Sequence, residues 1–132
     1  MATIFSKIIA GEIPSYKVAE DNQFYAFLDI RPMAKGHTLV VPKQETDYLF
    51  DLEDELLAAM ILFSKKVAAA IKVAIPCQRI GVMVMGLEVP HAHVHLIPMQ
   101  NEGDMNLSNP KLQLTEKEFA TIAESIRSAF VS

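Results

Sequence analysis

The chain has 132 residues, of which 51 % are hydrophobic, and its 12 basic and 16 acidic residues give a formal net charge of −4. A chain of this length can bury a core without metal or disulfide staples, so we expect a single domain over residues 1–132. The acidic excess and the absence of a long basic run argue against binding to long nucleic acids, although a single nucleotide needs no basic surface.

The cysteine content and the hydropathy of the chain indicate a cellular compartment. Cys77 is the one cysteine, so an internal disulfide is impossible and a reducing environment is expected. Residues 1–15 lack the layout of a signal peptide, and no apolar run approaches the roughly 18 residues of a membrane helix. We therefore expect a cytoplasmic protein with no membrane partner.

The first part of the chain predicts a short helix followed by an antiparallel meander. The helix is expected over residues 5–10, because Gly11 ends it and Pro14 prevents its continuation. Three strand-like runs follow, each bounded by turn-prone residues. They cover residues 16–19, 23–30 and 37–41.

A long helix is predicted over residues 51–74, where the apolar residues change to a helical period. Its apolar positions cover about half of the helical wheel, more than the roughly 100° stripe that one core face needs. They are Leu56, Leu57, Met60, Ile61, Phe63, Val67, Ala68 and Ile71. The extra width favours a second apolar partner, for which we expect another copy of the chain. The alternative is a helix enclosed within its own monomer.

Two further strands and a closing helix complete the predicted fold. The strands are expected at residues 79–85 and 91–97. Residues 101–132 predict a surface loop and then a helix, which begins at a capping box formed by Thr115 and Glu118. The predicted fold class is therefore α+β, with an antiparallel sheet of about five strands and two main helices.

Three of the four histidines lie at alternate positions in the segment VPHAHVHLIP, within the last predicted strand. Alternate residues of an extended strand share a face and lie about 6.8 Å apart, so His91, His93 and His95 would form a row. The small and branched residues between them suit the opposite, core-packed face. Because burying several imidazoles without partners is costly, the row predicts a chemical role.

Two chemistries fit this row of histidines. A neutral imidazole is nucleophilic near neutral pH and can attack phosphorus, with flanking imidazoles as donors to the phosphate oxygens. His93 is the natural attacker, because it alone has a histidine on each side. The alternative is a zinc site in which His37 joins His93 and His95 as the third ligand. We favour the nucleophilic chemistry, which needs no cofactor.

The histidine segment resembles the pattern His-φ-His-φ-His-φ-φ of the histidine triad (HIT) family of nucleotide hydrolases and transferases. Further matching pieces occur in the family's order, and the likeness covers about residues 3–98. These pieces are Ile4–Ile9 with Gly11–Pro14, Phe27–Ile30 with Pro32, and Gly36–Lys43. The opening residues look most like the branch that hydrolyses purine nucleoside phosphoramidates.

The resemblance implies an assembly and an activity. The sheet would join that of a second copy in a two-fold homodimer, and a purine nucleotide such as AMP or GMP would lie between the first helix and the triad strand. The reaction would be hydrolysis of a nucleoside 5′-phosphoramidate or a related nucleotidyl phosphoanhydride through a nucleotidyl-histidine, which releases a nucleoside monophosphate. The alternative is a catalytically weak, nucleotide-binding regulatory module.

The resemblance also assigns roles to single residues. His93 would be the nucleophile, and the backbone carbonyl of His91 would hold its far ring nitrogen. His95 and His37 would contact the phosphate. Asp29 would bind the ribose hydroxyls, although a turn-forming role is the alternative from its sequence context. The nucleotide site would be completed by Ile4, Phe5, Ile8, Leu28 and Ile30 as the wall of the base pocket, and by Gly86 and Glu88.

Two departures from the family pattern change the expected site. Many members carry Cys at the positions of Thr3 and Ser6, where they help to bind a structural zinc, so no such metal is expected here. Typical phosphoramidases have polar residues before the triad, where this chain has Leu87 and Glu88. Phosphate contacts there would come from backbone N–H groups. We interpret Glu88 as an exposed turn carboxylate, with proton relay to the leaving group as the alternative.

Overall fold

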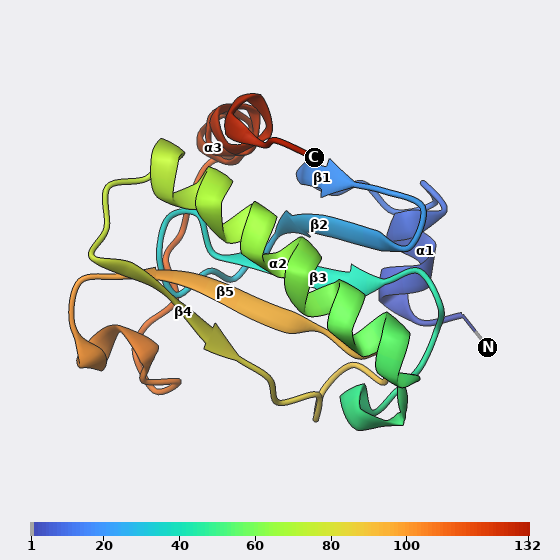
Figure 1. The fold of residues 1–132 in the computed structure, drawn as a ribbon. Coiled ribbons are helices and arrows are strands. Elements are labelled where there is room, and N and C mark those ends of the chain that lie inside the picture. The colour runs from blue at the N-terminus through green and yellow to red at the C-terminus, as the bar shows by residue number, and fades with distance from the viewer. Residues whose placement is uncertain (1) are drawn as a thin grey trace.

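The computed structural model describes residues 2–132 and shows a five-stranded antiparallel sheet with helices on both faces (Figure 1). The strands are β1 (Lys17–Glu20), β2 (Phe24–Leu28), β3 (Thr38–Pro42), β4 (Arg79–Met83) and β5 (Val94–Met99), in the spatial order β1-β2-β3-β5-β4. The helices are α1 (Ile4–Ile9), α2 (Asp54–Ala74) and α3 (Glu116–Ala129), with 3-10 turns at Leu49–Asp51 and Glu102–Met105. The predicted α+β class is confirmed.

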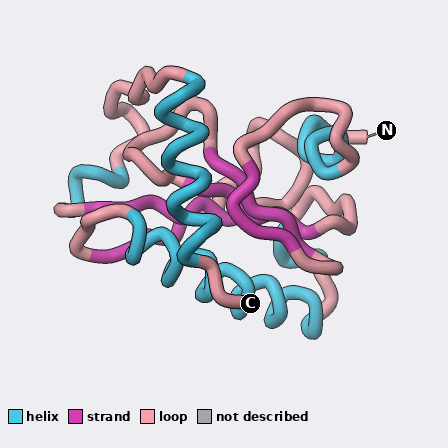
Figure 2. Tube along the Cα trace, turned by 90° about the horizontal axis from the view of Figure 1, so that it is seen from above, coloured by secondary structure: helices cyan, strands magenta, loops and turns pink. Residues whose placement is uncertain are grey.

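The sheet separates two apolar cores, and β2 belongs to both. All five of its residues are buried, because alternate side chains point to opposite faces and each face is covered. Phe24, Ala26 and Leu28 pack with α2 and α3, whereas Tyr25 and Phe27 pack against α1. In Figure 2, the strands lie between α1, near the N-terminus, and α2 on the other side.

The long helix α2 buries only part of its wide apolar surface. Met60, Val67 and Ile71 are fully buried against the sheet. Ile61 and Leu62 are 50 % and 61 % exposed, so the helix is not enclosed within its own monomer. The second copy that would cover this outer face stays a prediction.

The strand that carries the histidines starts later than predicted. β5 begins at Val94, so the predicted strand over residues 91–97 is wrong for its first three residues. Of the expected row, the rings of His93 and His95 lie side by side with centroids 5.1 Å apart, whereas His91 departs from it. The physical reason lies in the backbone: the His91 N–H donates to the Val89 carbonyl and the Ala92 N–H to the Thr46 carbonyl, instead of to a neighbouring strand. The side chains of Ala92 and Val94 pack in the core beside α2, as expected.

The C-terminal segment returns to the sheet and closes the fold. Both hydrogen bonds of the predicted capping box between Thr115 and Glu118 are present at the start of α3. Before that helix, the Leu112 N–H donates to the Pro32 carbonyl at 2.9 Å, which ties the C-terminal loop to the segment after β2. Within residues 2–132, none of the helices combines the length and the apolar character needed to cross a membrane.

Candidate active site

A hollow of about 570 Å³ lies beside the histidines, a size typical of small-ligand sites. It is bounded by α1, the residues after β2 and β4, and the C-terminal loop. Of the twelve residues predicted for the site, it is lined by Ile4, Phe5, Ile8, Leu28, Asp29, Ile30, His37, Gly86, Glu88, His93 and His95. The twelfth, His91, lies outside it. The fold therefore brings residues from four separate parts of the chain to one place.

One wall of the hollow is apolar and is built by α1. Thr3 caps this helix by accepting the Ser6 N–H, and the helix presents Phe5 and Ile8 toward β2 and β3. The Phe5 ring lies edge-on to the ring of His93, with centroids 5.1 Å apart. Leu28 is different, because its side chain packs in the core on the opposite side of the sheet. The wall offers an apolar surface next to a histidine.

His93 is held by one backbone contact. Its Nδ1 lies 2.7 Å from the carbonyl oxygen of His91. A carbonyl can only accept, so Nδ1 carries the hydrogen, and a neutral ring then has its lone pair on Nε2. The resemblance implies this carbonyl contact, and the structure contains it. The arrangement gives His93 a nucleophilic nitrogen at the hollow.

The ring of His91 has a structural role. It is fully buried, with Nε2 2.8 Å from the Pro42 carbonyl and Nδ1 2.7 Å from Thr3 Oγ1. Burial lowers the pKa of His91, which keeps the ring neutral with its hydrogen on Nε2. Thr3 therefore donates its hydroxyl hydrogen to Nδ1. His91 serves the site through its carbonyl, and its ring fastens that part of the backbone.

His95 and His37 form a second pair with its own backbone anchor. β3 and β5 pair with Leu39 opposite His95, which brings the two rings together. The Met33 N–H donates to His37 Nδ1 at 3.0 Å, so His37 carries its hydrogen on Nε2 and donates it to His95 Nδ1 at 2.9 Å. The remaining nitrogen of His95, Nε2, must then carry a hydrogen. This series of hydrogen bonds makes His95 Nε2 a donor.

Burial keeps this second pair neutral. It lowers the pKa of both His37 and His95 to about 4, and the nearby Lys111 ammonium adds to the effect on His37. At neutral pH both rings are therefore uncharged, and the donor at His95 is a neutral N–H. Its hydrogen bond to an anionic oxygen would be charge-assisted only through the acceptor.

Together with Asp29, the pair of His37 and His95 also has the ligand types of a metal site. One ligand atom each of Asp29, His37 and His95 lie within 4.8 Å of one another, a different set from the His93, His95 and His37 site considered above. A metal would need a lone pair on His37 Nε2, whereas the Met33 N–H requires the lone pair on Nδ1. The Met33 N–H therefore favours the hydrogen bonds from Met33 to His37 and from His37 to His95 over metal ligation.

Asp29 combines the two roles considered from the sequence. Its Oδ1 accepts the Arg31 N–H at 2.8 Å, which is a turn-forming contact. Its Oδ2 lies 3.6 Å from His37 Nε2 at the edge of the hollow. Burial raises the pKa of Asp29, partly offset by the hydrogen bond from Arg31. One carboxylate oxygen is thus used by the turn, and the other faces the hollow.

The segment between β4 and the histidines forms the open side of the hollow. Gly86 has φ +70°, in the left-handed region that favours glycine, and turns the chain there. Leu87 is 85 % exposed, and Glu88 is also exposed. Within residues 2–132 the Glu88 carboxylate has no hydrogen-bond or ion-pair partner. This agrees with an exposed turn carboxylate.

Several residues that line the hollow were not predicted from the sequence, among them Met33, Leu107 and Lys111. Met33 acts through its backbone N–H, and Leu107 and Lys111 line the hollow from the C-terminal loop. Lys111 donates to the carbonyls of Leu107 and Asn109, which holds its ammonium near His37. The C-terminal loop has no hydrophobic periodicity, so the sequence does not indicate that it returns to the hollow. The long-range backbone hydrogen bond from Leu112 to Pro32 helps to hold it there.

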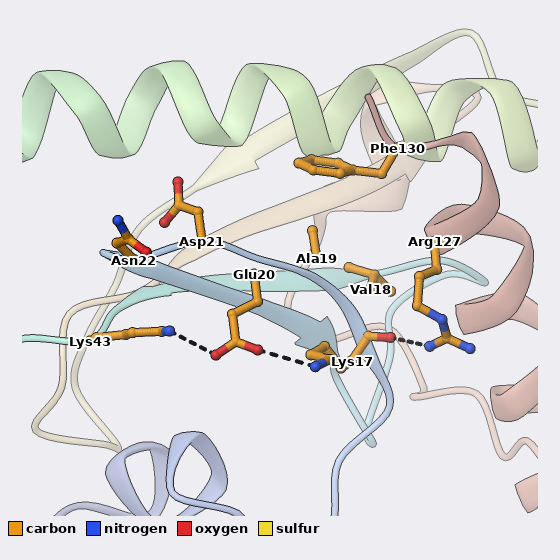
Figure 3. A pocket seen from close by; sticks show the side chains of 9 residues that line it. All are labelled: Lys17, Val18, Ala19, Glu20, Asp21, Asn22, Lys43, Arg127 and Phe130. Carbon is orange, nitrogen blue, oxygen red and sulfur yellow. Dashed lines mark hydrogen bonds and ion pairs between the residues drawn. The ribbon is translucent and has the colours of Figure 1, made fainter. Parts of the chain in front are cut away.

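A second hollow, of about 530 Å³, lies along the edge strand β1 (Figure 3). Most of its charged side chains have partners: Glu20 accepts from both Lys17 and Lys43, and Arg127 donates to the Lys17 carbonyl. The hydrogen bond from Lys43 is the largest cause that lowers the pKa of Glu20. No histidine or cysteine is among its lining residues. The first hollow is therefore the candidate active site.

Comparison with known proteins identifies the family of the chain. Residues 10–102 match the HIT domain family. The chain is 44 % identical over 103 residues to adenosine 5′-monophosphoramidase HNT1 of Saccharomyces cerevisiae. This alignment covers 76 % of the chain and 65 % of the yeast protein. It is 37 % identical over 134 residues to adenosine 5′-monophosphoramidase hnt1 of Schizosaccharomyces pombe. That alignment covers 97 % of the chain and 98 % of the relative.

A solved structure shows the same architecture. The crystal structure of a HIT-like protein from Bartonella henselae, described as involved in cell-cycle regulation, superposes with a TM-score of 0.83 at 36 % identity. The match covers 97 % of this chain and 96 % of that one. With the family match over residues 10–102, these similarities show that the chain belongs to the HIT domain family.

Proposed function

We propose that the chain hydrolyses a nucleoside 5′-phosphoramidate, or a related nucleotidyl phosphoanhydride, through a nucleotide bound covalently to His93. The observation that carries this proposal is the contact between His93 Nδ1 and the His91 carbonyl, which leaves Nε2 as a nucleophile at the hollow. The two yeast relatives named adenosine 5′-monophosphoramidase support the substrate class.

In the first step, Nε2 of His93 attacks the α-phosphorus and the bond from phosphorus to the leaving nitrogen breaks. The leaving amine takes a proton from solvent. The ring of His93 becomes a cation whose Nδ1–H still points at the His91 carbonyl, so the developing positive charge meets a fixed dipole. The Nε2–H of His95 is placed to donate to a phosphoryl oxygen.

In the second step, water attacks the phosphorus and the bond from phosphorus to His93 Nε2 breaks. The water loses its proton to solvent, the products are a nucleoside monophosphate and neutral His93, and the site is ready for another cycle. The same donors serve both steps, because both pass through a similar arrangement of phosphoryl oxygens. The protein contributes position and fixed hydrogen-bond donors.

The rest of the nucleotide fits the remaining surface of the hollow. The free oxygen of Asp29 can accept from ribose hydroxyls, and the apolar wall with Phe5 and Ile8 suits a purine. We also propose a homodimer, in which a second copy covers the exposed apolar face of α2 around Ile61 and Leu62. Sedimentation at increasing protein concentration tests the dimer.

The function is tested by rapid quenching with adenosine 5′-phosphoramidate followed by intact mass measurement. We expect wild-type protein to gain the mass of an adenylyl group, and His93→Ala to gain none while its turnover falls by more than about a thousandfold. Activity of His93→Ala within about tenfold of wild type would contradict the assignment. Binding of AMP with no adduct and no turnover would favour the regulatory alternative.

A further inference from the structure

The buried ring of His91 is enclosed by a network that the proposed chemistry does not use. We propose that Thr3 and Glu45 are positioning residues, which hold His91 so that its carbonyl accepts the Nδ1–H of His93. They touch neither the hollow nor the reacting atoms. The kinetic part of this proposal rests on the proposed role of His93, whereas its effect on the His93 ring does not.

The first component of the network is the segment that follows β3. The Pro42 carbonyl accepts from His91 Nε2 at 2.8 Å, and the Thr46 carbonyl accepts the Ala92 N–H at 2.7 Å. The Ala92 N–H and the His91 carbonyl belong to one planar trans peptide and point in opposite directions. Fixing the N–H on Thr46 therefore aims the carbonyl away from it, toward His93.

The second component is the hydroxyl of Thr3. Because His91 Nε2 donates to Pro42, Nδ1 can only accept, and Thr3 Oγ1 supplies the hydrogen at 2.7 Å. The same oxygen accepts the Ser6 N–H at 3.0 Å. Thr3 thus joins the first turn of α1 to the ring of His91. Without this hydroxyl, a buried ring nitrogen would lack its donor, and the ring would lose one of its two anchors.

The third component is the carboxylate of Glu45. Its Oε1 accepts the Thr3 N–H at 2.9 Å and the Ser6 hydroxyl at 2.6 Å. The hydrogen bond from Ser6 is the largest cause that lowers the pKa of Glu45, so the group is ionised at neutral pH. Glu45 therefore fastens the segment after β3 to the start of α1. The two elements that contact His91 are held together by one side chain.

These residues do not fit a metal centre. Zinc sites in proteins use thiolate, imidazole and carboxylate ligands, whereas Thr3 and Ser6 offer hydroxyls. The hydroxyls, the carboxylate oxygen Oε1 and the ring nitrogens of His91 already have hydrogen-bond partners. Because His91 Nδ1 needs a donor, the Thr3 hydroxyl hydrogen goes to His91 at 2.7 Å rather than to Ser6 Oγ at 3.2 Å, and the Ser6 hydroxyl donates to Glu45. In this chain, hydrogen bonds brace the position of His91.

Two substitutions test the network, each with a conservative partner. Thr3→Val removes the hydroxyl at nearly constant shape, and Thr3→Ser retains it. Glu45→Ala removes the exposed carboxylate without opening the core, and Glu45→Gln retains an acceptor. Asp47→Asn, an exposed carboxylate on the same segment, is the matched control. Each variant is assayed with adenosine 5′-phosphoramidate, and long-range ¹H–¹⁵N NMR reports the tautomer of His93.

The network predicts that wild-type His93 carries its hydrogen on Nδ1 and that Thr3→Val shows a mixture of tautomers. We expect kcat to fall by at least about tenfold in Thr3→Val, with KM changed by less than about threefold, because a wrong tautomer impairs attack more than binding. Thr3→Ser should recover most of kcat. Glu45→Ala should show a smaller loss in the same direction, and Asp47→Asn none.

Two results would overturn the proposal. One is a Thr3→Val protein with unchanged His93 tautomer and kcat. The other is a Glu45→Ala protein that behaves as Asp47→Asn does, which decides the matter if Thr3→Val fails to fold. If wild-type protein shows no turnover, the proposed function fails, but the His93 tautomer in wild type and Glu45→Ala still tests the network.

Discussion

His93 and His95 lie two residues apart and line the same hollow, yet backbone groups fix their rings in opposite tautomers. His93 gives its Nδ1 hydrogen to a carbonyl, whereas His95 receives a hydrogen at Nδ1 from His37, whose own Nδ1 is occupied by the Met33 N–H. The first ring therefore presents a lone pair and the second a hydrogen. In each case a backbone group at the end of the hydrogen-bonded series fixes the tautomer of the imidazole.

The largest effects on activity are expected from substitutions of His93, the proposed nucleophile, and of His95. His95→Ala removes one donor to the phosphoryl oxygens, so kcat should fall by about 10²–10³. The adenylyl adduct should still form slowly, in contrast to His93→Ala, which should form none. Quenched-flow mass measurement separates the two variants. If His95→Ala formed no adduct, the assignment of the attack to His93 would be contradicted.

The anchor of the second pair is tested at His37. His37→Ala leaves the Met33 N–H and His95 Nδ1 without partners, so we expect a loss of about 1–3 kcal/mol in the free energy of unfolding. We also expect about tenfold lower kcat, because His95 is free to adopt the other tautomer. His37→Gln keeps an acceptor and a donor and should be milder in urea unfolding and in kinetics. Equal losses in both variants would remove the hydrogen-bond explanation.

The low pKa values of the second pair predict a pH-dependent stability. Both pKa values fall from 6.5 to about 4 on folding, so between these pH values the unfolded chain binds more protons than the folded one. The free energy of unfolding should therefore decrease as pH falls from about 6.5 to about 4, by at most about 1.4 kcal/mol per pH unit for each imidazole.

Urea unfolding over this pH range measures that slope, and His37→Gln is its control. The variant lacks one of the two groups, so its slope should be smaller than that of wild type. A variant with the wild-type slope would mean that other groups cause the dependence, and that His37 is not kept neutral by burial.

The smallest effect is expected at the open side of the hollow. Glu88 is exposed and has no hydrogen-bond or ion-pair partner within residues 2–132, so Glu88→Gln should change kcat/KM by less than about twofold. The pH–rate profile should keep its shape. A lost or shifted limb in that profile would revive the proton-relay alternative for Glu88.

Much of this site could be predicted from sequence, and the exceptions share a cause. The alternation around Ala92 and Val94 correctly predicted a packing face, and the family resemblance implied segments that lie together at the hollow. The late start of β5 was not predicted, because it depends on the Thr46 carbonyl, far from the histidines in sequence. Met33 contributes only a backbone N–H, which no side-chain pattern can reveal.

The most direct test of this account is the protonation of the two rings in the wild-type protein near neutral pH. Long-range ¹H–¹⁵N NMR correlations distinguish Nδ1–H from Nε2–H in neutral imidazoles. We predict Nδ1–H for His93 and Nε2–H for His95. The opposite pair of tautomers, or rapid exchange between both forms in His93, would contradict the assignment of nucleophile and donor.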